Sequence, residues 1–367
     1  MLPALKKMTY KKGVFILLFL IGLFLVGSLT IWKLWTELLF SNQYPGGDLA
    51  RLGYAAKQKR ITIDNLPRRH LEMKDYRGQK IDLLTVGDSF SQGGGGGLNR
   101  YYQDAIASST GMTVLNIAPY QDKLKKTSDP DQLDPVNTLL LLINSGYIDR
   151  IKPGYILLES VERMCGERLN KTLDLQQSVA LEKLEAYYKH DSSAVDRLPQ
   201  TFFLNNANRK FVYYNLRYYM TGKGHPTVPR AALTKPLFTG DNPSTLLYLH
   251  DDLVMLANHR QKDVEAINMS LNLIADMLQR KGIRFYFMPV VDKSNLYRPY
   301  LVSKELPESS FFEKIRPLIK RYQFVDSKAL LAGELSCGEL DIFHYDDTHW
   351  TWKASQVIAR QTVFSTR

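Results

Sequence analysis

The chain has 367 residues, a formal net charge of +11, and 44% hydrophobic and 11% aromatic residues. This length suits one large or two small domains, and the composition excludes a disordered chain in favour of a globular fold with a buried core. The sequence has no block of Lys and Arg and no nucleic-acid-binding motif, so we expect no nucleic-acid partner. The basic surplus could attract an anionic polymer, but a solvated basic surface is the more ordinary explanation.

An uncharged apolar run from Val14 to Trp32 is long enough to cross a bilayer as a helix. Four lysines precede it within the first 12 residues, and the positive-inside rule therefore places the N-terminus in the cytoplasm. The run does not end in small residues, which favours an uncleaved anchor over a signal peptide. We expect a cytoplasmic tail (1–13), a transmembrane anchor (14–36) and a soluble part outside the cytoplasmic membrane, in the periplasm or the extracellular space.

Short apolar segments alternate with helical patterns in the rest of the chain. The predicted strands are 81–86, 113–117, 155–159, 283–291 and 324–325, and the predicted helices are 136–149, 263–281, 311–322 and 353–363. Strands that alternate with helices indicate an α/β fold with a parallel sheet and right-handed crossovers. We expect residues 37–80 to be a stalk and lead-in, and residues 81–367 to be one catalytic domain.

Residues 166–260 break this alternation and are interpreted as an insertion near the active-site edge. Tyr213, Tyr214, Tyr218 and Tyr219 lie close together within it. Aromatic rings stack well on sugar faces, but clustered tyrosines more often fill a local core, and we expect the core.

Two motifs could supply a nucleophilic acyl-transfer site. Ser89 lies in Gly-Asp-Ser-Phe-Ser directly after a predicted strand, at the sheet edge where ligands bind in open α/β folds. His349 lies in Asp-Asp-Thr-His-Trp near the C-terminus. A serine hydroxyl needs a base to take its proton, and the base needs a carboxylate to orient it. We assign Ser89 as nucleophile, His349 as base and Asp347 as its carboxylate, with Asp346 as the alternative acid.

The oxyanion donors are less well defined. The Ser89 N–H is one candidate, aided by a helix expected to follow it. A second donor could come from residues 118–121, or from the loop after the third strand. In that loop Arg163 could bind substrate or pair with Glu159 or Glu162.

No cofactor or metal is expected. His344, Asp346 and His349 could form a metal cluster, but zinc prefers more histidine or thiolate ligands than these residues offer. Cys165 and Cys337 could form a disulfide in an oxidising compartment or remain two free thiols, and both alternatives stay open.

The two motifs together resemble the SGNH (GDSL-type) hydrolase superfamily, and most closely its branch of alginate and related exopolysaccharide O-acetyltransferases. Residues 290–293, followed by Tyr297 and Pro299, also resemble a stretch of those proteins. The resemblance covers about 81–165 and 265–365. It implies a flavodoxin-like three-layer α/β/α sandwich that transfers acetyl groups to sugar hydroxyls beside a multi-pass membrane acyltransferase.

Several features depart from the family pattern. The Asp-x-His-Trp motif follows the serine motif here, whereas it precedes it in the alginate enzymes; this order is that of ordinary SGNH hydrolases and of the D-alanyl transfer proteins of teichoic acid synthesis. The family's block-two glycine is not evident in residues 116–120, and Leu158-Glu159-Ser160 replaces the block-three Gly-x-Asn. The remaining oxyanion or substrate candidates are Asp88, Glu159, Arg163, Lys293, Tyr297 and Trp350.

Three functions follow as hypotheses. The first is a membrane-anchored extracytoplasmic O-acyltransferase, in particular an acetyltransferase, that modifies a polysaccharide. The second is a carbohydrate esterase with the same site and water as the acceptor. The third is a non-catalytic glycan-binding or scaffold subunit of an exopolysaccharide export complex.

Overall fold

The computed structural model describes residues 10–37, 47–55, 65–97, 99–120, 134–170, 173–190, 203–240 and 242–360. Most of the expected cytoplasmic tail, parts of the lead-in, Gln121 and the end of the last expected helix lie outside these ranges.

A six-stranded parallel sheet with the order β1-β3-β2-β4-β7-β8 forms the centre of the fold. Its strands are β1 (Leu71–Glu72), β2 (Leu83–Val86), β3 (Val114–Ile117), β4 (Tyr155–Val161), β7 (Arg284–Val290) and β8 (Gln323–Phe324). The five strands predicted from the sequence are confirmed, and β1 is an addition from the expected lead-in. Every residue of β2 and β3 is buried, as expected for strands covered on both faces.

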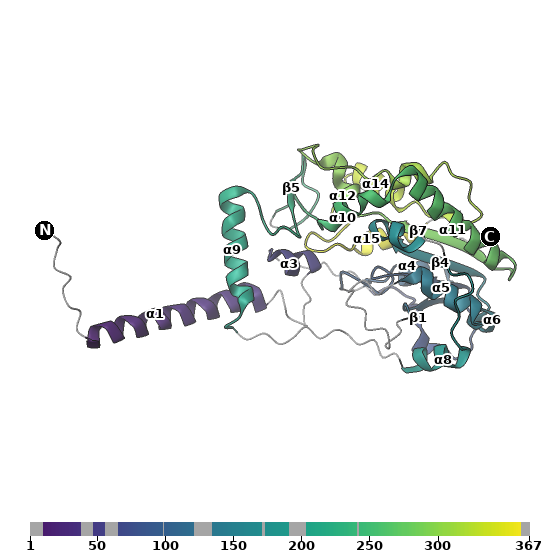
Figure 1. The fold of residues 1–367 in the computed structure, drawn as a ribbon, viewed down its shortest axis with the longest axis horizontal. Helices are drawn as coiled ribbons and strands as arrows, with labels where there is room; N and C mark the ends of the chain where they lie inside the picture. Colours follow the sequence, from purple (N-terminus) through teal and green to yellow (C-terminus); the bar gives the residue numbers. More distant parts are fainter. Residues whose placement is uncertain are drawn as a thin grey trace.

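Helices cover both faces of this sheet (Figure 1). One group consists of α4 (Tyr102–Thr110), α14 (Ser327–Ser336) and α15 (Trp352–Ala359), and the other of α5 (Pro135–Asn144), α7 (Cys165–Leu169) and α11 (Gln261–Gln279). Short helices α6 (Tyr147–Ile151), α12 (Lys293–Tyr297) and α13 (Phe311–Ile315) connect them. The periodic apolar residues of α11, among them Val264, Ile267 and Leu271, are all buried, which confirms the amphipathic pattern.

The strand order places a topological switch point at β2. The connection after β2 leads to β3 on one side, and the chain then passes back over β2 to β4 on the other side. Connections that leave neighbouring strands in opposite directions open a crevice at the carboxyl ends of those strands, where ligands bind in open α/β folds. Ser89 follows β2 directly and therefore lies at this crevice.

The segment interpreted as an insertion does break the alternation. It contains α8 (Leu181–His190), α9 (Asn206–Thr221), α10 (Asp251–Val254) and an antiparallel pair of strands, β5 (Arg230–Ala232) and β6 (Thr245–Leu247). The pair β5–β6 is separate from the central sheet.

The N-terminal helix α1 (Tyr10–Ile31) continues as a π-helical turn over Trp32–Thr36. The 25 residues from Lys12 to Thr36 are long and apolar enough to cross a membrane. Figure 1 shows α1 extending away from the globular part of the chain, and most of its apolar side chains are exposed.

One expectation, about the tyrosines of α9, is corrected, and the alternative left open for the two cysteines is decided. Tyr213 and Tyr219 are 57% and 88% exposed, so they do not fill a local core. The physical reason is that α9 stands beside the end of α1 and packs along one flank only. The cysteines are free: Cys165 is buried in α7, whereas Cys337 is exposed at the end of α14, so no disulfide joins them.

Candidate active site

Ser89 lies in a sequence of turns that follows β2. Gly87 is required by close packing, because a Cβ there would lie 2.0 Å from Ser91 Oγ and 2.3 Å from a carboxylate oxygen of Glu159. Turns continue through residues 89–95, and the next helix, α4, begins only at Tyr102. The helix expected directly after Ser89 is therefore absent, and the glycine-rich segment explains this, since glycine disfavours helix.

Asp88 fixes the serine turn from beneath. Its Oδ2 accepts hydrogen bonds from the guanidinium of Arg168 (2.5 Å) and the backbone N–H of Val161 (2.9 Å), and its Oδ1 accepts one from the N–H of Phe90 (3.2 Å). Burial opposes ionisation, but Arg168 and these hydrogen bonds lower the pKa of Asp88. The Asp88 carboxylate thus has a structural role, because these three hydrogen bonds hold the turn in place.

Glu159, another substrate candidate, also supports the turn. Its Oε2 accepts hydrogen bonds from the N–H of Asp88 (3.0 Å) and from Ser91 Oγ (2.9 Å). Burial and the neighbouring Asp88 charge raise the pKa of Glu159 well above its usual value, which favours its neutral form. Its position beneath Ser89 makes it a structural group.

The structure brings Ser89, His349 and Asp347 into one chain of hydrogen bonds. His349 Nε2 lies 2.7 Å from Ser89 Oγ, and His349 Nδ1 lies 2.6 Å from Asp347 Oδ1. The same Asp347 oxygen accepts the backbone N–H of His349 at 3.0 Å. With Nδ1 donating to the carboxylate, Nε2 is free to accept the serine proton, which is the arrangement of a nucleophile, a base and its orienting acid.

Asp346, the alternative acid, has a different role. Its Oδ2 accepts the N–H of Gly47 at 3.2 Å and its carbonyl accepts the N–H of Ala50 at 3.0 Å. These contacts bind the start of α3 (Asp48–Gly53) to the loop that carries His349. The geometry therefore assigns the carboxylate beside the imidazole to Asp347.

Lys293 positions the loop that carries the acid and the base. Its buried ammonium donates hydrogen bonds to the carbonyl oxygens of His344 (2.7 Å), Tyr345 (2.7 Å) and Asp347 (3.1 Å). A single cation thereby holds three carbonyl oxygens of one short loop. Lys293 therefore stabilises the loop that carries Asp347, and its ammonium is already used by these hydrogen bonds.

Tyr297 and Trp350 are likewise part of this support. The hydroxyl oxygen of Tyr297 accepts the N–H of Phe343 at 3.2 Å. The Trp350 ring packs edge-on against Phe90 with 5.0 Å between ring centroids, and Phe90 also lies 4.6 Å from the imidazole of His349. Trp350 therefore buttresses the ring that supports the base.

Arg163 forms ion pairs with carboxylates other than those expected. Its Nη1 lies 2.7 Å from Asp292 Oδ1 and 3.5 Å from Asp252 Oδ1. Glu162 instead accepts hydrogen bonds from Asn295 and from the backbone of Asp292. The alternative that Arg163 pairs with Glu159 or Glu162 is thus wrong, because Asp292 after β7 and Asp252 in α10 supply its partners.

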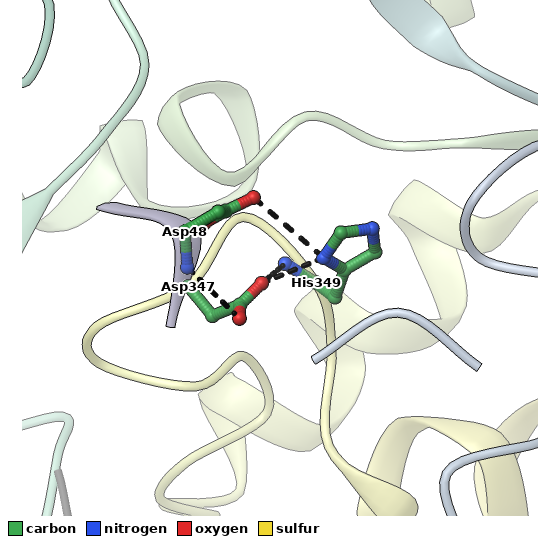
Figure 2. Close-up of side chains that lie close together, drawn as sticks. All are labelled: Asp48, Asp347 and His349. Atoms are coloured by element: carbon green, nitrogen blue, oxygen red, sulfur yellow. Dashed lines mark hydrogen bonds and ion pairs between the residues drawn. The ribbon is translucent and has the colours of Figure 1, made fainter. Parts of the chain in front are cut away.

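Asp48, from the expected lead-in, is a site residue that the sequence did not identify (Figure 2). Its Oδ2 lies 3.8 Å from His349 Nδ1, and its backbone N–H donates to Asp347 Oδ2 at 3.2 Å. Its Oδ1 accepts the N–H of Thr348 at 2.7 Å. Burial, followed by the charge of Asp347, raises the pKa of Asp48. A helix-initiating Gly-Asp carries no signal that it would reach a histidine far downstream.

The pKa of His349 is raised despite burial. Burial favours the neutral imidazole, but the charge and hydrogen bond of Asp347 and the charge of Asp48 outweigh it. Two carboxylates beside one ring therefore stabilise the imidazolium that forms when His349 accepts a proton.

The glycine run after Ser89 lies directly against the base. A Cβ on Gly94 would stand 2.2 Å from both Cδ2 and Nε2 of His349. A Cβ on Gly95 would stand 2.9 Å from His344 Cδ2, and Gly95 also has a φ of +83°. Gly94 and Gly95 thus form a closely packed wall of the site.

Asp48, Asp347 and His349 are also a set whose donor atoms lie within 4.8 Å of one another, close enough to hold a metal ion. This set differs from the alternative of His344, Asp346 and His349. Hydrogen bonds to His349 and Thr348 already account for the closeness of the carboxylates.

The backbone N–H of Ser89 has no acceptor within the described parts of the chain and is available to an oxyanion. In the expected second loop, Tyr120 N–H donates to Thr138 Oγ1 at 2.9 Å, and Pro119 has no N–H. Neither can be the second donor.

Comparison of the chain with protein-family models, with curated proteins and with solved structures finds no match in any of the three. The chemistry of the site is therefore inferred from its own side chains and their hydrogen bonds.

Proposed function

We propose that this protein is a membrane-anchored O-acyltransferase, in particular an acetyltransferase, that modifies hydroxyl groups of a polysaccharide through an acyl-enzyme on Ser89. The observation that carries the proposal is the chain of hydrogen bonds from Ser89 Oγ to His349 (2.7 Å) and from His349 to Asp347 (2.6 Å). Such a chain activates a hydroxyl that is otherwise a weak nucleophile.

In the first half-reaction Ser89 Oγ attacks the acyl carbon of the donor while His349 Nε2 takes the serine proton. The Ser89 N–H faces the developing oxyanion. The imidazolium then gives its proton to the leaving group, and the acyl group remains on Ser89. The carboxylates of Asp347 and Asp48 favour this step because they stabilise the charged ring.

In the second half-reaction His349 takes the proton of an acceptor hydroxyl, whose oxygen attacks the acyl-enzyme. Ser89 recovers its proton and the acyl group leaves as an ester of the acceptor. The same residues would serve an esterase if water reached the acyl-enzyme first. The apolar helix α1 favours transfer, because an anchor keeps the site beside a membrane where a multi-pass acyltransferase could deliver acyl groups.

The proposed family is the SGNH superfamily. The order β3-β2-β4-β7-β8 is the flavodoxin-like strand order, and the nucleophile follows the strand at the switch point. Both features support the resemblance of the two motifs. The four lysines that precede the apolar run Val14–Trp32 support a cytoplasmic N-terminus and a periplasmic or extracellular site.

The test uses the full-length protein purified in detergent and p-nitrophenyl acetate as donor. We expect p-nitrophenol release and an adduct of about 42 Da on Ser89, the mass of one acetyl group in an acyl-enzyme. Ser89→Ala should abolish both, whereas the exposed Ser303→Ala should change neither. Release that is equal in all three proteins would refute the proposed nucleophile.

A second measurement separates the two acceptors. Added oligosaccharide should speed p-nitrophenol release and yield acetylated sugar if the protein is a transferase. Free acetate formed at an unchanged rate, with no sugar ester, would instead assign an esterase.

A further inference from the structure

Helix α9 carries an exposed apolar stripe. Val212, Tyr213, Leu216, Tyr219 and Met220 are 44%, 57%, 55%, 88% and 72% exposed. Residues spaced by three and four positions share one face of a helix, so these side chains form a continuous strip. A strip of this kind on a soluble surface marks a site of contact with a protein or a membrane.

A flank of α9 adjacent to this stripe is attached to the last turns of α1. The side chain of Asn208 donates to the carbonyl of Ser28 at 3.0 Å and accepts from the hydroxyl of Thr36 at 2.5 Å. Phe211 stacks on Trp35 with 5.8 Å between ring centroids. In Figure 1 α9 runs across the end of α1 rather than along it.

This attachment sets the depth of α9 if α1 crosses a bilayer. The 25 residues from Lys12 to Thr36 span about 37 Å at 1.5 Å per residue, somewhat more than a hydrocarbon core of about 30 Å. The turns that contact α9 therefore reach the outer boundary between acyl chains and headgroups. A helix that crosses α1 at this level lies in the plane of the membrane surface.

We propose that α9 is an interfacial helix whose apolar stripe lies in the outer leaflet of the bilayer that α1 crosses. Tyrosine is enriched at such interfaces, because its ring is apolar and its hydroxyl reaches water. Arg209, which is exposed on the same helix, adds a cation that can pair with lipid phosphates. The proposal rests on α1 as a membrane span and is independent of the reaction at Ser89.

The position of α9 also connects the membrane surface with the triad. Asn215 donates to the carbonyl of Tyr54 at 2.7 Å, and Tyr214 stacks on the Tyr54 ring at 5.9 Å. Tyr54 ends α3, whose first residue is Asp48. A membrane-bound α9 thus fixes α3, and with it the acid and base, at a set height above the bilayer.

The test places a fluorescent probe on the stripe of the full-length protein in vesicles of phosphatidylcholine and phosphatidylglycerol. In a Cys337→Ser background, Tyr219→Cys is labelled with an environment-sensitive dye; the remaining Cys165 is buried and protected from the label. Ile319→Cys is the matched control, because Ile319 is 87% exposed and contacts α11, far from α1. Phe19→Cys, exposed on α1, reports insertion of the anchor.

We expect nitroxide groups on the lipid acyl chains to quench the Tyr219 and Phe19 probes several-fold more than the Ile319 probe. A Leu216→Glu substitution should reduce quenching at Tyr219 while quenching at Phe19 persists. If the Tyr219 probe responds like the Ile319 probe and is quenched by aqueous iodide, the proposal is overturned. The apolar stripe would then be a contact surface for a protein partner. A Phe19 probe in water would overturn it as well, because the premise of a spanning α1 would fail.

Discussion

The carboxylate of Asp48 lies 3.8 Å from Nδ1 of His349, although one residue precedes the whole sheet and the other follows it. Asp347 takes the short hydrogen bond from the imidazole, and Asp48 adds a second negative charge without a direct hydrogen bond to the ring. Both charges raise the pKa of His349 against the effect of burial. Asp48 is therefore a positioning and electrostatic residue rather than a member of the proton path.

We predict that Asp48→Asn moves the acidic limb of the pH–rate profile to lower pH. His349 must be neutral to accept the serine proton, so kcat/KM falls as the pH falls through the His349 pKa. Removal of the Asp48 charge removes one of the interactions that raise this pKa, and the neutral imidazole persists to lower pH. The measurement is kcat/KM for p-nitrophenyl acetate across the acidic range.

The control for this prediction is Asp149→Asn, which removes a surface carboxylate that pairs with Lys281. It should leave the profile in place. An asparagine at position 48 can still accept the N–H of Thr348, so the loop should keep its shape. An unshifted limb in Asp48→Asn would contradict the electrostatic role.

We predict that Asp347→Asn lowers kcat by about 10⁴-fold, the loss typical of an orienting carboxylate in such triads. An amide at this position favours the wrong imidazole tautomer. Asp346→Asn should lose far less, because its side chain accepts a hydrogen bond from Gly47 rather than from His349. Comparison of kcat for the two variants decides between the carboxylates, and a larger loss in Asp346→Asn would reverse the assignment.

The parts of the fold that follow from local pattern could be predicted from the sequence. Short apolar runs, the first of them followed by Gly87, predicted the buried strands, and helical spacing of apolar residues predicted α11. The predicted length of helix 311–322 was too great, because α13 ends at Ile315. Ser89 and His349 were identified because their motifs combine reactive residue types with turns at strand ends.

Contacts between distant segments could not be predicted in this way. Asp48 lies beside the His349 ring and binds the backbone of Thr348, and Lys293 binds the backbone of Asp347, but nothing in the local sequence of either residue indicates these contacts. The sequence likewise could not separate Asp347 from Asp346. The Asp346 carboxylate accepts the N–H of Gly47, just before α3, and this contact lies far away in the sequence. The exposed tyrosines of α9 escaped prediction because clustering does not reveal which flank of a helix is covered.

We predict that Gly94→Ala abolishes most of the activity while the protein remains folded. The added Cβ would stand 2.2 Å from Nε2 of His349 and must displace either the ring or the loop. Either movement breaks the 2.7 Å contact with Ser89. The measurement is the rate of p-nitrophenol release together with the circular dichroism spectrum.

Gly97→Ala is the matched control for this substitution. Its φ of +86° makes alanine strained, but the new Cβ would meet nothing within 4 Å. Strain alone should cost about 1–2 kcal/mol of stability and leave turnover nearly unchanged. Equal losses in both variants would indicate that loop flexibility, rather than contact with the imidazole, matters.

The last prediction concerns Glu159 and the pH dependence of stability. Burial and the charge of Asp88 raise its pKa well above the usual value, so the folded protein keeps this proton at a pH where the unfolded chain has lost it. The wild-type protein therefore loses stability as the pH rises from about 4.5, the usual pKa of a glutamate, towards the raised pKa of the folded state. Glu159→Gln cannot ionise and keeps an oxygen that accepts hydrogen bonds from Asp88 N–H and Ser91 Oγ. The Tm of Glu159→Gln should thus fall less with rising pH than that of the wild type, and the two should converge in acid. A Tm difference that is the same at every pH would show that Glu159 is ionised in the folded protein.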